Sequence, residues 1–191
     1  TACIVGAGTQ ARLQLQALTL VRPIKRAAIW ARNHEKAITA AQDLSTSLGI
    51  EVRVEEDLQA AVKAADIVVT TTPATRPLIE ADWLQPGQHI TAMGSDQSEK
   101  CELEPACISR ADLYVPDRQS QTELLGELHH ALDEGLIPRG REFTELGEIA
   151  AGQAAGRTGT EAVTICDLTG TGVQDTAIAT YACLLYQSEA A

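Results

Sequence analysis

The first residues of the chain impose the strongest constraint on its fold. An apolar run over Cys3–Val5 is followed at once by the pattern G-x-G-x-x-A and then by a helical pattern over 10–21. Gly6 permits a tight turn, Gly8 lets the backbone approach a pyrophosphate, and Ala11 allows close helix–sheet packing. The helix N-terminus adds N–H groups and partial positive charge that suit phosphates. A turn without a ligand is the weaker alternative. The expected cofactor-binding residues here are Gly6, Gly8, Thr9, Gln10 and Ala11.

The remaining sequence alternates apolar strand patterns with helical patterns. This alternation predicts an α/β fold of the Rossmann type, with a doubly wound, mostly parallel sheet and helices on both faces. The low aromatic content of 3% predicts a core of Ala, Val, Leu and Ile, which suits such a sheet. Further strands are expected at 27–31, 51–54, 67–71, 89–93, 113–115 and 163–166. Further helices are expected at 33–48, 57–64, 105–110, 122–132, 143–155 and 174–186.

Length and composition limit the remaining possibilities. A length of 191 residues with 45% hydrophobic residues predicts one domain, or one domain with an appendage, and a substantial core. The chain lacks an initiator Met and enters a core strand by residue 3, so we expect residues 1–191 to be a domain of a longer protein. The net charge of −11 argues against nucleic acid and anionic membrane surfaces as partners. With no signal peptide or long apolar span, a cytoplasmic location is expected.

The cysteines and histidines predict neither a metal site nor a disulfide framework. No C-x-x-C pair occurs among the five cysteines. Cys3, Cys166 and Cys183 stand in apolar runs and are expected in the core. The neighbouring His129 and His130 would point in different directions on a helix, so we interpret them as surface residues.

The end of the second strand carries the information on cofactor choice. NAD enzymes commonly have Asp or Glu about 20 residues after the glycine-rich turn, where it binds the ribose 2′-OH. This chain has Arg32 and Asn33 there and no acid until Glu35. Arg32 suits a 2′-phosphate, which favours NADP over NAD; a solvated loop residue is the alternative. Arg32 and Asn33 therefore join the expected cofactor-binding residues.

The Thr-rich segment after the strand at 67–71 lies near the expected switch point of the sheet, where ligands bind. Its hydroxyl groups suit a ribose, although Thr is also a common strand residue, and the two interpretations are equally supported. This loop adds Thr70, Thr71, Thr72 and Pro73 to the candidates.

Four sequence blocks follow one another along the chain: Gly6–Ala11, Thr70–Pro73, Met93–Asp96 with Lys100 and Glu102, and Asp167–Ala179. Together they resemble the ornithine cyclodeaminase and mu-crystallin family. The last block is the most specific, because Thr-Gly-x-x-x-Gln-Asp after a strand is rare elsewhere. Its full run resembles the ectoine-utilisation cyclodeaminases and the iminosuccinate reductases.

The resemblance implies further site residues and a second domain. It places Met93 and Gly94 among the cofactor-binding residues. It makes Asp96 the catalytic candidate, facing the substrate near the nicotinamide, whereas an Asx turn is the alternative role. A preceding domain would carry the Arg and Lys that hold the substrate and would form a homodimer, and nothing in this chain matches it.

The family's chemistry is hydride transfer at the Cα of an amino or imino acid. Cyclodeaminases oxidise, lose ammonia and reduce again, whereas reductases and dehydrogenases perform part of that cycle. The resemblance thus implies an NAD(P)-dependent enzyme with a small amino or imino acid substrate, inactive as residues 1–191 alone. The alternative is a mu-crystallin-like NADP-binding protein with a mainly ligand-binding role.

Overall fold

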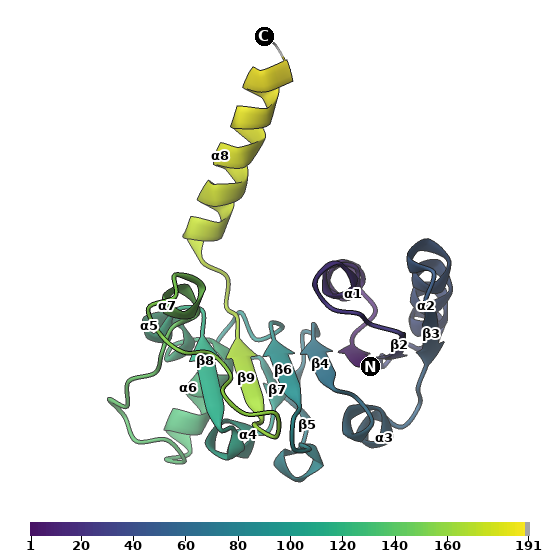
Figure 1. Ribbon diagram of the computed structural model, residues 1–191. Helices are drawn as coiled ribbons and strands as arrows, with labels where there is room; N and C mark the ends of the chain where they lie inside the picture. The colour runs from purple at the N-terminus through teal and green to yellow at the C-terminus, as the bar shows by residue number, and fades with distance from the viewer. Residues whose placement is uncertain (190–191) are drawn as a thin grey trace.

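The chain forms a seven-stranded parallel sheet with helices on both faces, as the sequence predicts (Figure 1). The computed structural model describes the backbone of residues 1–189 and the side chains of residues 1–186. The first strand lies inside the sheet between the second and fourth, which is the expected Rossmann arrangement. In spatial order the strands are β3 (Glu51–Val54), β2 (Arg26–Trp30), β1 (Ala2–Val5), β4 (Ile67–Thr70), β6 (His89–Ala92), β9 (Thr164–Asp167) and β8 (Leu113–Pro116).

The helices divide between the two faces of the sheet. Those packed on the first face are α1 (Thr9–Val21) and α2 (His34–Leu48). Those packed on the second face are α3 (Leu58–Lys63), α4 (Ala106–Arg110) and α6 (Gly126–Asp133). Because β1 is covered on both faces, its alternate side chains enter both cores: Ile4 lies with α1 and α2, and Val5 lies with α3.

Local sequence signals explain where several elements begin and end. The side chain of Asn33 accepts a hydrogen bond from the Lys36 N–H at the start of α2, and Asp57 caps α3 in the same way. Gly49 ends α2 with φ of 65°. These predicted boundaries are confirmed.

Three predictions about individual elements are wrong. The helix expected at 143–155 is only α7 (Leu146–Ala150). The helix expected at 122–132 is divided into α5 (Gln119–Thr122) and α6, because the chain turns at Gly126 with φ of 66°. A loop is expected over 72–77, after β4, but its second half instead enters β5 (Thr75–Ile79). This strand pairs with β7 (Cys101–Leu103) in a small second sheet. The short helix η1 (Ala81–Trp83) follows β5.

The helix α8 (Gly172–Glu189) projects away from the body of the molecule (Figure 1). Cys183 lies on it and is exposed, so the prediction that it is a core residue is wrong, whereas Cys3 is buried. Cys101 and Cys107, which stand in no apolar run that predicts burial, are also buried. Among the described residues, no helix is long and apolar enough to cross a membrane, and no cluster of side chains suits a metal ion.

Candidate dinucleotide-binding site

The predicted site residues gather at the carboxyl ends of the parallel strands. Val5 pairs with Trp30 of β2 and with Thr70 of β4, so these three strands end at the same level. The loops that leave them, and the loop after β6, therefore share one edge of the sheet. In open α/β sheets this is the edge at which ligands bind.

The glycine-rich turn after β1 is shaped by the residues around it. Gly6 has φ of 126°, and its N–H donates to the Trp30 carbonyl over 2.8 Å. A Cβ atom on Gly6 would lie 2.5 Å from Oγ1 of Thr71, so a side chain there would displace the neighbouring loop. Ala11, in the first turn of α1, is completely buried. Gly6 and Ala11 are therefore required by the packing of the turn itself.

Gly8 differs from Gly6 because packing does not require it. Its φ of −83° is open to any residue, and a Cβ atom there would meet no protein atom within 4 Å. Gly8 precedes α1, whose first turn has no side-chain cap and no acidic residue. The turn thus offers open space beside backbone N–H groups of Thr9 and Gln10, which are exposed. These features fit a pyrophosphate.

The end of β2 places Arg32 and Asn33 beside this turn. Arg32 is exposed and has no hydrogen-bond or ion-pair partner among the described side chains. Asn33 uses its side-chain oxygen to cap α2, which leaves its amide group for other contacts. Between the starts of α1 and α2 lies a depression of about 220 Å³. It is lined by Ala7, Arg12, Glu35, Lys36 and Thr39.

The Thr-rich segment after β4 directs its hydroxyl groups toward protein acceptors. Thr71 donates to the Val5 carbonyl over 3.2 Å, and Thr72 donates to Oε1 of Glu102 over 2.6 Å. Thr70 is completely buried, whereas Pro73 is exposed. In this structure, Thr71 and Thr72 can offer a ribose only acceptor oxygens.

The loop after β6 lies against this Thr-rich segment. Met93 packs against the core on the α1 side, and its N–H donates to the Thr70 carbonyl over 3.2 Å. A Cβ atom on Gly94 would lie 2.2 Å from Oε2 of Glu102 and 2.3 Å from the carbonyl oxygen of Thr72. Only glycine allows the two loops to approach this closely.

Asp96 stands at the exposed end of the same loop. Its carboxylate accepts from Nζ of Lys100 over 2.5 Å, and its side chain is 52% exposed. We expected His130 to be a surface residue, but its Nε2 lies 2.6 Å from the backbone carbonyl of Lys100, so its ring contacts this loop. The hydrogen bond of Asp96 joins it to a side chain rather than to the backbone N–H of an Asx turn. Asp96 is accessible to a ligand at the carboxyl edge.

Two buried acids, Glu127 and Asp167, support these loops, a role that the sequence does not predict for either of them. Glu127 accepts from the Ser95 hydroxyl and from the N–H groups of Glu102 and Leu103. Burial, and secondly the charge of Asp167, raises the pKa of Glu127 to about 8. No local pattern in the sequence indicates these roles, since Glu127 stands in an ordinary helical segment.

Asp167 ends β9 and holds the start of α6. Its Oδ2 accepts from the Tyr114 hydroxyl over 2.6 Å and from the N–H groups of Glu127 and Leu128 over 2.9 and 3.2 Å. Its Oδ1 has no partner among the described residues. Burial raises the pKa of Asp167 to about 7. This carboxyl group caps α6, which has no side-chain cap of its own.

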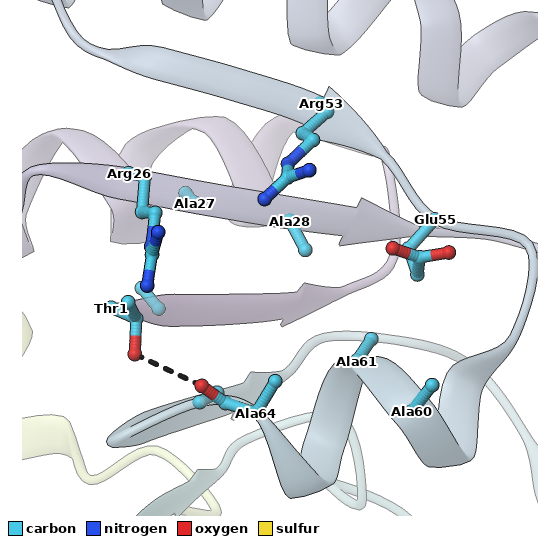
Figure 2. Close-up of a pocket in the computed structure, with 11 residues that line it drawn as sticks. Thr1, Arg26, Ala27, Ala28, Arg53, Glu55, Ala60, Ala61 and Ala64 are labelled. Carbon is cyan, nitrogen blue, oxygen red and sulfur yellow. Dashed lines mark hydrogen bonds between the residues drawn. The ribbon is translucent and has the colours of Figure 1, made fainter.

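Two other cavities lie away from this edge. Figure 2 shows one of about 290 Å³ between β2 and α3, lined largely by alanines, with Arg26 and Arg53 on the strands and Glu55 beyond β3. Its lining includes Thr1, which directly precedes β1 and so lies at the opposite end of that strand from the glycine-rich turn. The other cavity, of about 630 Å³, lies over β6, β9 and β8 on the same side of the sheet as α1, and α7 borders it. Neither contains the glycine-rich turn.

Comparison with known proteins gives a consistent result. Residues 1–187 match the model of the ornithine cyclodeaminase/mu-crystallin family. An uncharacterized cyclodeaminase of Sinorhizobium fredii is 58% identical over 181 residues, which cover 95% of this chain and 55% of that protein. The chain thus spans about half the length of this relative.

Solved structures agree with the fold. An archaeal alanine dehydrogenase dimer with bound NAD superposes with a TM-score of 0.90 at 31% identity, over 100% of this chain and 59% of that one. The Δ1-pyrroline-2-carboxylate reductase of Thermococcus litoralis, in complex with NADH and L-proline, gives 0.90 at 30% identity, over 98% and 58%. With its seven-stranded Rossmann-type sheet, its glycine-rich turn and this family match over 1–187, the chain belongs to the ornithine cyclodeaminase/mu-crystallin family.

Proposed function

We propose that residues 1–191 form the nucleotide-binding domain of an NAD(P)-dependent enzyme acting at the Cα of an amino or imino acid. The turn at Gly8 carries this proposal: it combines open space with an uncapped helix N-terminus in a chain of this family. The relatives extend the argument, since one binds NAD and another was solved with NADH and L-proline. Cyclodeamination and imine reduction both lie within this class.

Different residues along the carboxyl edge of the sheet would bind different parts of the cofactor and the substrate. The N–H groups of Thr9 and Gln10 would bind the pyrophosphate, and Arg32 would meet the adenosine ribose, where it favours a 2′-phosphate and hence NADP. Asp96 would face the substrate and hold or move a proton there. The bound nicotinamide would supply the hydride chemistry.

The substrate-holding groups and the homodimer contacts are proposed to belong to a domain outside residues 1–191. The matched stretch covers 55% of the Sinorhizobium protein and 59% of the alanine dehydrogenase, which is a dimer. Hydride transfer requires the substrate carbon within roughly 3–3.5 Å of the nicotinamide, held from both walls of a cleft. Residues 1–191 alone are therefore expected to bind cofactor without turnover.

A ligand-binding role without turnover is the second candidate. One observation favours it: the carboxylate of Asp96 is engaged by Lys100 of its own loop. A carboxylate held by a Lys is less available to exchange a proton with a substrate. Turnover by the intact protein with amino or imino acids would exclude this candidate.

Calorimetry on Gly8→Val tests the primary proposal. The valine side chain would occupy the space assigned to the pyrophosphate, and its Cβ atom would meet no protein atom within 4 Å, so we expect the fold to persist. We expect binding of NADH and NADPH to fall below detection while the circular dichroism spectrum is unchanged. Unchanged binding in this variant would contradict the proposed site.

A further inference from the structure

We propose that Glu102 is a positioning residue of this site: its buried carboxylate joins the loops after β4 and β6 and so shapes the surface for the nicotinamide half of the dinucleotide. This inference rests on the proposed function. Glu102 is the middle residue of β7, a strand outside the main sheet, and its side chain is completely buried. It touches the candidate loops rather than the expected ligand.

The two carboxylate oxygens of Glu102 hold different loops. Oε1 accepts from both the N–H and the hydroxyl of Thr72, each over 2.6 Å. Oε2 accepts from the Gly94 N–H over 2.8 Å. The carboxylate therefore connects the segments after β4 and β6 directly, without a water or a ligand between them.

The surroundings of Glu102 are arranged to keep the carboxylate in place. Its own backbone N–H donates to Oε1 of Glu127 over 2.9 Å, and the same oxygen accepts from the Ser95 hydroxyl. Burial raises the pKa of Glu102, whereas the hydrogen bonds from Thr72 and Gly94 oppose that rise by stabilising the ionised form. Three donors converging on one buried acid are what a fixed carboxylate requires.

The order of the strands assigns Glu102 to one half of the dinucleotide. The adenosine end is expected at β2, beside Arg32, and the pyrophosphate at the turn between β1 and α1. Continuing in the same direction, the next strands are β4 and β6. The nicotinamide half should therefore lie over the loops that Glu102 joins, whereas the adenosine half should not.

The test compares NADH with ADP-ribose, which lacks the nicotinamide. In Glu102→Gln, one side-chain atom becomes an NH₂ group that faces the N–H of Thr72 or of Gly94, so one of the loops loses its acceptor. We expect the affinity for NADH to fall about tenfold and that for ADP-ribose to change less than about twofold. Glu102→Asp should behave similarly, because the shorter side chain cannot span both loops.

Glu104→Gln is the matched control. The Glu104 carboxylate also accepts a backbone N–H, that of Ala81, over 2.6 Å, but it lies away from the loops after β4 and β6. A Gln oxygen can keep that single bond, so neither affinity should change. Calorimetry measures all three variants, and retained ADP-ribose binding reports that the β1–α1 region remains folded.

The outcomes separate this inference from the proposal beneath it. Unchanged NADH affinity in Glu102→Gln, or an equal loss of both ligands in the Glu102 variants, would overturn the positioning role. A wild-type chain that binds neither NADH nor ADP-ribose would instead contradict the proposed function.

Discussion

The turn after β1 and the loops after β4 and β6 reach the same edge of the sheet, but they are held there by different chemistry. The turn depends on backbone hydrogen bonds and small residues, as at Gly6, whose N–H binds the Trp30 carbonyl. The loops depend on the buried carboxyl groups of Glu102 and Glu127. Glycine serves both regions, since Gly94 permits the close approach of Glu102 to the Thr72 loop.

This difference has consequences for stability as well as for binding. A turn made of backbone and small side chains needs no buried charge and is insensitive to pH. A buried carboxyl group must be compensated by hydrogen bonds, and its protonation changes the stability of everything it holds. The β6–β9–β8 side of the molecule should therefore be more sensitive to pH than the β1–β2 side.

The largest effect is expected for Gly94→Ala. The new Cβ would lie 2.3 Å from the Thr72 carbonyl oxygen, which is backbone and cannot easily move. We expect a loss of roughly 3 kcal/mol in the free energy of unfolding, at the upper end of the usual cost of overpacking. Urea denaturation followed by circular dichroism measures it. Gly8→Ala, which meets open space, is the control and should cost less than about 1 kcal/mol. Equal losses in the two variants would contradict the close contact between Gly94 and the Thr72 loop.

The next effect concerns catalysis by the intact protein. Asp96→Asn should lower turnover about 100-fold, within the usual contribution of a general acid or base, because the side chain is expected to face the substrate. The affinity for NADH should change less than about twofold. Steady-state assays with candidate imino and amino acids, alongside calorimetry, measure the two quantities. Full activity of this variant would reduce Asp96 to a loop residue that pairs with Lys100.

A smaller effect is expected at the adenosine end. Arg32→Ala removes a charge-assisted contact to a 2′-phosphate, worth about 1.5–3 kcal/mol, and should weaken NADPH binding about tenfold or more. NADH binding should hardly change. Arg53→Ala, which removes a guanidinium from β3 beside the cavity of Figure 2, serves as the control. If Arg32→Ala weakens both cofactors equally, Arg32 does not select between them.

The smallest effect is a change in the pH dependence of stability. The folded-state pKa of Asp167 is about 7, raised by burial, so this carboxyl group is more protonated in the folded chain than in the unfolded chain between about pH 4 and 7. Asp167 therefore contributes stability that is complete below its unfolded pKa and is lost as pH rises through about 7. Asp167→Asn keeps the acceptor oxygen for Tyr114 and removes this titration. The midpoint temperature of thermal unfolding should fall less steeply between pH 4 and 8 in the variant than in the wild type. Identical slopes would contradict the raised pKa of Asp167.

The sequence predicted the β1–β2 side better than the other side because its determinants are local. The spacing of Gly6, Gly8 and Ala11 and the caps at Asn33 and Asp57 are short-range patterns, and the structure confirms the turn and both helix starts. Cofactor binding at these residues remains a prediction.

The supporting acids could not be predicted in this way. Glu102 meets Thr72 across 30 residues and Asp167 meets Glu127 across 40, so these contacts exist only after β4, β6 and β9 have assembled. The helix expected at 122–132 was interrupted for a related reason: Gly126 turns the chain so that the N–H groups of α6 can reach Asp167. The short β7 gave too few residues for a periodic pattern.

Hydrogen–deuterium exchange of the chain with and without saturating NADH tests the central claim most directly, namely that one dinucleotide lies across both regions. We predict slower exchange in peptides that cover 6–12 and in those that cover 93–102, with no change at the 143–155 segment. Bound NADH that leaves exchange over 6–12 unchanged would contradict the account.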